Sequence, residues 1–200
     1  MTDYPEPDVE VDAVSATTLA DRLDAGESVR LLDVRNRDEF EAWQIDGGET
    51  TLVPYMKWLQ ADATDSVADL AADVDGDGPI TVVCGRGEAS AYVAGLLTEA
   101  GIDARNLADG MEGWARVYRD HEITDSDPIV VQYQRPASGC LGYLIVAGGE
   151  AVVVDPLRAF TDRYVADAAE RDAEITTVVD THVHADHVSG LRDLADETGA

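Results

Sequence analysis

Three of the chain's four histidines lie within six residues near its carboxyl end. They follow residues 176–180, a β-branched and apolar run that predicts a buried strand. Side chains two positions apart in an extended segment point the same way, so His182 and His184 can face one metal ion. Asp186 and His187 are predicted to begin a helix and to face a second ion. Because imidazole and carboxylate are ligands for zinc, iron and manganese, the cluster predicts a metal site on a strand–turn–helix unit.

This segment resembles the metallo-β-lactamase superfamily, whose H-x-H-x-D-H loop follows a strand and opens a helix. Residues 129–200 carry the resemblance, and the sequence motif around the histidines is most similar to those of the persulfide dioxygenase and glyoxalase II branches. The resemblance implies a divalent metal, zinc or iron, held by His182, His184, Asp186 and His187. The alternative is a solvated polar loop that binds no metal. The family completes its site with ligands beyond the stretch present here, so we expect an incomplete domain that is inactive by itself.

A second chemical feature is a cysteine at the end of a predicted strand. Residues 80–83 are apolar and β-branched, Cys84 follows them, and glycines precede a helix predicted at 91–100. The amide N–H groups of such a loop can turn toward one anion, and the helix dipole behind them favours thiolate over thiol. We therefore interpret Cys84 as a nucleophile rather than as a packed strand-end cysteine. The predicted anion-binding loop comprises Gly85, Arg86, Gly87, Glu88, Ala89 and Ser90.

Three segments around this loop, 31–40, 45–48 and 109–114, resemble the rhodanese family in order and spacing. The resemblance covers residues 11–118 and implies sulfur transfer through a cysteine persulfide. Ala89 stands where many members place arginine or threonine, so Arg86 and Arg35 become candidate cations for the donor; the alternative is that both are solvated. The related phosphatases and arsenate reductases need an arginine where this chain has Ser90, which cannot grip an oxyanion with two donors. Sulfur transfer is therefore favoured over phosphoester hydrolysis.

The two resemblances predict an α/β chain with a rhodanese-like parallel sheet covered by helices on both faces, followed by the first part of a metallo-β-lactamase αββα sandwich. We expect a loose N-terminus at 1–10, the rhodanese-like domain at 11–119, a polar linker ending in proline at 120–128, and the second domain at 129–200. A domain of about 70 residues is marginal by itself, so the chain is expected to be the first part of a longer product.

The chain is strongly acidic, with a formal net charge of −27 and a pI near 4.1. Such charge repels itself in dilute buffer and is screened in molar salt, which favours a protein adapted to a salty cytoplasm over an acidic protein of an ordinary cell. Nucleic acid and membranes are therefore not expected as partners. Neither a membrane span nor a secretion signal is apparent, and two cysteines in separate domains, Cys84 and Cys140, indicate a reducing, cytoplasmic compartment. Cys140 is interpreted as a packed residue.

These features together predict a sulfur relay through a Cys84 persulfide, with small sulfur donors and thiol acceptors as partners and homo-oligomerisation left open. The second domain would act on thiol conjugates or persulfides. Two other classes stay open: a metal-dependent thioester hydrolase whose rhodanese-like domain is a vestigial binding module, and a non-catalytic sensor of sulfur or metal.

Overall fold

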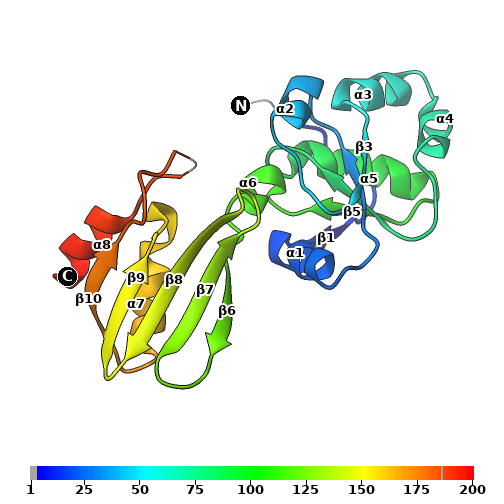
Figure 1. Cartoon of the computed structure of the whole chain (residues 1–200). Coiled ribbons are helices and arrows are strands. Elements are labelled where there is room, and N and C mark those ends of the chain that lie inside the picture. The colour runs from blue at the N-terminus through cyan, green and yellow to red at the C-terminus, as the bar shows by residue number, and fades with distance from the viewer. Residues whose placement is uncertain (1–3, 186) are drawn as a thin grey trace. The chain divides into compact units, whose positions relative to one another are not determined.

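The computed structural model describes residues 4–185 and 187–200. The chain divides into two compact units, Met1–Val117 and Tyr118–Ala200, and each unit is built on its own five-stranded sheet (Figure 1). Each sheet also has its own cluster of buried apolar side chains. In the part of the chain that is described, no helix has the length and apolar character needed to cross a membrane.

The first unit is a parallel sheet with the strand order β1-β5-β4-β2-β3. Its strands are β1 (Asp12–Val14), β2 (Arg30–Asp33), β3 (Glu49–Leu52), β4 (Ile80–Val83) and β5 (Ala104–Leu107). All four residues of the central strand β4 are buried, because a parallel sheet is covered on both faces. This arrangement explains why β4 is a continuous apolar run rather than an alternating one.

Six helices surround this sheet: α1 (Ala16–Asp24), α2 (Arg37–Ala42), α3 (Tyr55–Ala63), α4 (Val67–Ala72), α5 (Glu88–Glu99) and α6 (Gly110–Trp114). Helix α5 packs against α3 and α4, whereas α1 packs against α6, and the two groups cover opposite faces of the sheet (Figure 1). Trp58 of α3 and Leu97 of α5 are fully buried in the core. The predicted parallel sheet with helices on both faces is confirmed.

The N-terminal segment differs from the loose tail predicted for residues 1–10. Residues 1–3 lie outside the described part, but Tyr4 packs edge to face against Tyr55, with ring centroids 5.5 Å apart. Pro7 lies so close to Gly95 that a Cβ at that glycine would collide with it. Tyr4 and Pro7 therefore contact the domain, although residues 4–10 form no helix or strand before β1.

The second unit is a mixed sheet with the order β10-β9-β8-β7-β6. Its strands are β6 (Arg119–Thr124), β7 (Ile129–Arg135), β8 (Cys140–Ala147), β9 (Glu150–Val154) and β10 (Glu174–Val179). Strands β6 to β9 form an antiparallel meander, and β10 joins β9 in parallel through the 3₁₀ turn η1 (Arg158–Phe160) and helix α7 (Thr161–Ala169). Helix α8 (Leu191–Thr198) follows, and Leu194 enters the core with Tyr164.

The segment 120–128 was predicted to be a linker, but its first half belongs to strand β6. This strand pairs antiparallel with β7 at the edge of the sheet. Its side chains are mostly exposed, so it shows no apolar periodicity, and its acidic residues form ion pairs with α7 and with the turn that follows this helix. Asp120 pairs with Arg163 at 2.7 Å, and Glu122 pairs with Arg171 at 3.2 Å. An edge strand that is held by hydrogen bonds and charge carries the same sequence pattern as a solvated linker.

Candidate functional site

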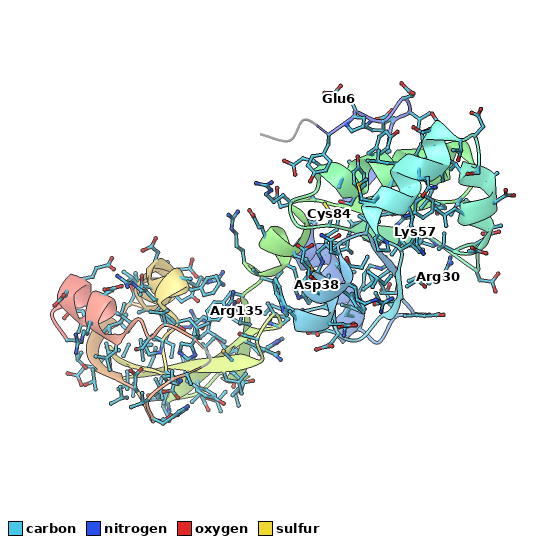
Figure 2. The ribbon with its side chains drawn as sticks, turned by 90° about the horizontal axis from the view of Figure 1, so that it is seen from above. Glu6, Arg30, Asp38, Lys57, Cys84 and Arg135 are labelled. Atoms are coloured by element: carbon cyan, nitrogen blue, oxygen red, sulfur yellow. The ribbon has the colours of Figure 1, made fainter. Side chains whose placement is uncertain are left out.

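Cys84 lies directly after β4, at the carboxyl end of the central strand, and α5 begins four residues later (Figure 2). The residue is buried, with 4% of its surface exposed. Its Sγ accepts a hydrogen bond from the Gly87 N–H at 3.1 Å and another from the Ser90 hydroxyl at 3.1 Å. Both donors come from the predicted segment 85–90, but only Gly87 belongs to the loop, because α5 begins at Glu88, earlier than predicted, and Ser90 lies in its first turn. They lie where they can stabilise negative charge on sulfur.

Ser90 is itself held by a residue that sequence reasoning missed. Its Oγ lies 2.7 Å from Asn106 Oδ1, on the neighbouring strand β5, and 3.2 Å from the Gly87 carbonyl. Because β5 pairs with β4 in parallel, the end of β5 reaches the same edge of the sheet as Cys84. No short motif links residues 16 positions apart, so the strand order had to be known before Asn106 could be assigned to the site.

Two glycines give the loop its shape. Gly87 has φ +100° and Gly110 has φ +53°, in the left-handed region that favours glycine. A Cβ at Gly110 would collide with the Cys84 carbonyl oxygen and lie 2.8 Å from the Arg86 nitrogen. Because Gly110 has no side chain, the start of α6 can approach the loop closely. The Met111 N–H there donates a hydrogen bond to the Cys84 carbonyl at 2.8 Å.

The two arginines predicted to serve the sulfur donor have different surroundings. Arg35 is buried and forms an ion pair with Asp33 at 2.6 Å, while its guanidinium also donates to the Trp43 carbonyl. Its charge is therefore neutralised within the fold, and it is neither solvated nor an uncompensated cation for a donor. Arg86 is exposed at the loop, and its Nε lies 3.9 Å from Glu88 Oε2.

A pocket of about 430 Å³ opens next to Cys84. Part of its wall comes from the loop, including Gly85, Arg86, Glu88 and the buried Ala89. The rest is supplied by distant segments, namely Tyr4, Val34, Arg35, Asn36, Glu39, Tyr55, Met56 and Glu112. The volume is sufficient for a small organic donor or acceptor beside the sulfur atom.

In the second unit, the histidine cluster lies at the edge where β9 and β10 end in parallel. One ligand atom each of Asp155, His182 and His184 can be chosen so that all three lie within 4.8 Å of one another. His184 Nε2 is 2.9 Å from Asp155 Oδ1, and the Thr181 N–H and hydroxyl both donate to the Asp155 carboxylate at 2.7 Å. Burial raises the pKa of Asp155, but the hydrogen bonds from Thr181 and His184 outweigh it, and the pKa lies below its ordinary value.

The other two predicted ligands are less well defined. The His187 ring lies beside that of His184, with centroids 4.0 Å apart, whereas Asp186 falls outside the described residues. The helix predicted to begin at these residues begins only at Leu191. The reason is that the chain first runs back along residues 156–158, where the Gly190 N–H donates to the Pro156 carbonyl and the Arg158 N–H donates to the Val188 carbonyl.

The geometry of the first unit defines its class: a parallel α/β domain with a thiol in a strand-end loop, closed by glycines and followed by a helix. Residues 15–117, more than half of the chain, match the model of the rhodanese-like domain, and the chain belongs to this family. Residues 135–200 match the model of the metallo-beta-lactamase superfamily. A rhodanese-like domain is thus followed by part of a metallo-β-lactamase fold.

Several solved structures are similar to one unit or the other. A rhodanese-like domain protein from Staphylococcus aureus is 26% identical over 52% of this chain and 91% of its own, with a TM-score of 0.43. The human single-domain sulfurtransferase is 26% identical over 52% and 96%, with a TM-score of 0.40. ETHE1 from Myxococcus xanthus is 32% identical over 42% of this chain, with a TM-score of 0.30, and the match spans 33% of ETHE1. No curated protein matches the chain.

Proposed function

We propose that the chain relays sulfur through a persulfide on Cys84 and that this relay is coupled to a metallo-β-lactamase-fold domain acting on persulfides or thiol conjugates. The observation that supports the sulfur relay is the environment of Cys84 Sγ. The sulfur lies at the end of the central strand, beside a pocket, and accepts hydrogen bonds from Gly87 and Ser90. Cys140 also accepts a hydroxyl hydrogen bond, from Ser138 at 2.9 Å, so what distinguishes Cys84 is the backbone N–H donor together with the adjacent pocket.

The proposed reaction has two transfers. The Cys84 thiolate attacks the sulfane sulfur of thiosulfate or of a low-molecular-weight persulfide; the new S–S bond forms as the donor's S–S bond breaks, and sulfite or a thiolate leaves. An acceptor thiolate then attacks the outer sulfur, and Cys84 leaves as a thiolate. Sulfur moves without net oxidation or reduction, and the Gly87 N–H and Ser90 hydroxyl stabilise the thiolate charge on Sγ before the first transfer and as Cys84 leaves in the second.

The second unit supplies a partial metal site in this proposal. His182, His184 and Asp155 offer nitrogen and oxygen ligands at one edge of the sheet, which suits zinc or iron. His187 and Asp186 are proposed as further ligands. A divalent metal there would act as a Lewis acid toward a thiol conjugate or persulfide. Persulfide oxidation is chemically matched to a domain that delivers persulfides, so we place this unit with the persulfide dioxygenase branch rather than with glyoxalase II.

The experiment compares two cysteine variants of the full chain. Transfer of sulfur from thiosulfate or a persulfide to cyanide or a dithiol should be abolished by Cys84→Ser and retained by Cys140→Ser. Cys140 is a matched control because it is equally buried, at 4% exposure, but lies at the start of β8 in the other unit. Equal losses in the two variants would contradict the assignment of Cys84 as the nucleophile.

The convergence of Asp155, His182 and His184 favours one other function, a metal-dependent thioester hydrolase in which the rhodanese-like domain only binds. Under that alternative, thioester hydrolysis would require the histidines and would be unaffected by Cys84→Ser. Under the sulfur relay, Cys84→Ser abolishes transfer whether or not the chain hydrolyses thioesters. Measuring both activities on Cys84→Ser and His184→Ala separates the two functions.

A further inference from the structure

The pocket beside Cys84 carries more carboxylate than uncompensated cation. Arg35 is already neutralised by the buried Asp33, and Arg86 has a carboxylate 3.9 Å from its Nε. That carboxylate belongs to Glu88, and two further exposed glutamates, Glu39 and Glu112, line the pocket beyond these two pairs. The pocket therefore keeps a negative charge, in a chain whose formal net charge is −27. A dianion such as thiosulfate is repelled by this field on its way to the sulfur atom.

The other part of the lining is aromatic and apolar. Tyr4 and Tyr55 pack edge to face against each other and both line the pocket, and Met56 of α3, also in the lining, is 67% exposed. Aromatic faces attract a cation through their quadrupole, and carboxylates attract it by charge. Tyrosines and glutamates in one small pocket thus form a favourable environment for an organic ammonium group, and a thioether beside them suits an alkyl chain.

We propose that this pocket selects, as its sulfur donor, an organic persulfide that carries an ammonium group and no carboxylate, in preference to thiosulfate. The proposal rests on the sulfur-transfer function proposed for Cys84. The Cys84 thiolate forms a bond to the outer sulfur of the donor while the donor's own S–S bond breaks. The outer sulfur keeps its proton and the donor departs as an aminothiolate, so the step needs neither oxidant nor reductant.

The test measures how fast the full chain gains one sulfur atom at Cys84, by intact mass and peptide mapping. The probes are cysteamine persulfide and thiosulfate, and each rate is divided by that donor's rate with a free low-molecular-weight thiol. We expect the normalised rate for cysteamine persulfide to exceed that for thiosulfate by at least about tenfold in dilute buffer. The ratio should shrink in molar potassium chloride, because salt screens the exposed carboxylates.

Charge-removing variants assign the preference to the pocket. In the double variant Glu88→Gln, Glu112→Gln, sulfur addition from thiosulfate should be faster and addition from cysteamine persulfide should be slower. The ratio of the cysteamine persulfide rate to the thiosulfate rate should therefore fall by about fivefold. Glu99→Gln is the matched control, because Glu99 is an exposed glutamate at the other end of the same helix α5 and does not line the pocket. This control should leave the ratio unchanged.

A normalised ratio near one, or a ratio that the double variant does not move, would overturn the ammonium preference while leaving sulfur transfer by Cys84 intact. If neither donor adds sulfur to Cys84, the proposed function itself fails. The two failures therefore give different results in the same experiment. A parallel measurement of unfolding by urea shows whether the double variant is folded before its rates are compared.

Discussion

The Ser90 hydroxyl lies 3.1 Å from Cys84 Sγ and, on its other side, 2.7 Å from Asn106 Oδ1. A hydroxyl has a single proton, so Ser90 can donate to the sulfur only while another group does not take that proton. As placed, the Asn106 amide oxygen accepts from Ser90 and competes with the sulfur for the proton, whereas a flipped amide would donate its NH₂ group to Oγ and leave the serine proton for the thiolate. We therefore expect the orientation of the Asn106 amide to control the Ser90–Cys84 hydrogen bond.

Replacing Asn106 by aspartate should weaken this hydrogen bond. An ionised carboxylate can only accept, so it takes the Ser90 proton, and it also adds negative charge near the sulfur. We expect Asn106→Asp to slow alkylation of Cys84 by iodoacetamide at neutral pH by about tenfold, since a hydrogen bond to a charged group contributes roughly 1.5–3 kcal/mol. Ser90→Ala should also slow it, and the double variant should lose less than the combined single effects. Fully additive losses would contradict the relay from Asn106 through Ser90.

Gly110→Ala should destabilise the first unit and disrupt its loop. The added Cβ would meet the Cys84 carbonyl and the Arg86 nitrogen, at a backbone with φ +53°. The matched control is Gly101→Ala, where φ is +89° but nothing lies within 4 Å of the added atom. The control measures the backbone strain, about 1–2 kcal/mol, and Gly110→Ala should cost clearly more in urea unfolding and should also reduce sulfur transfer. Equal costs at the two glycines would show that α6 does not need this close approach.

Tyr92 links α5 to α3 and should make stability fall at alkaline pH. Its hydroxyl donates to Asp62 at 2.6 Å, and this hydrogen bond, with burial, raises the pKa of Tyr92 from 10.0 to about 12. Between pH 10 and 12 the unfolded chain loses this proton and the folded chain keeps it, so the free energy of unfolding decreases as pH rises. Tyr92→Phe should make the slope of the unfolding free energy against pH less steep, by the equivalent of up to about one proton. Urea unfolding at several pH values measures it, and identical slopes would refute the assignment.

The sequence was most informative where chemistry and burial coincide. The run at 80–83 forms β4, whose four residues are all buried. The run at 176–180 forms most of β10, but it is not the buried strand that was predicted: Thr176, Thr177 and Val179 are exposed, and Ile175 is the buried residue of that strand. It was least informative where a contact depends on strand order. Asp155 precedes His184 by 29 positions and reaches it because β9 and β10 pair in parallel. Likewise, the sequence indicated Arg35 as a cation available to the donor. Its ion pair with the buried Asp33 became evident only in the structure.

The acidic surface should make thermal stability depend on salt. A net charge of −27 repels itself in dilute buffer, and molar salt shortens the screening length from about 10 Å to about 3 Å. We expect Tm to rise by more than about 5 °C between dilute buffer and molar potassium chloride, which corresponds to about 2 kcal/mol for a chain of this size. Sucrose at matched osmolality is the uncharged control. A flat Tm in salt, or an equal rise in sucrose, would argue against screening.

Metal binding by the second unit should be weak and should depend on the three residues that converge there. Asp155, His182 and His184, together with the proposed ligands Asp186 and His187, would supply part of a coordination sphere, and water would complete it on the open side, which lowers affinity. We expect zinc to bind the chain measurably in competition with a chromogenic chelator but to be lost on dialysis against a mild chelator. His182→Ala and Asp155→Asn should each weaken zinc binding by about tenfold or more.

His121→Ala is the control, because His121 is an exposed histidine on β6 that does not belong to the cluster. One equivalent of zinc retained through dialysis would mean that the coordination sphere is completed in another way. If His121→Ala weakened zinc binding as much as the cluster variants do, the cluster would not be the binding site.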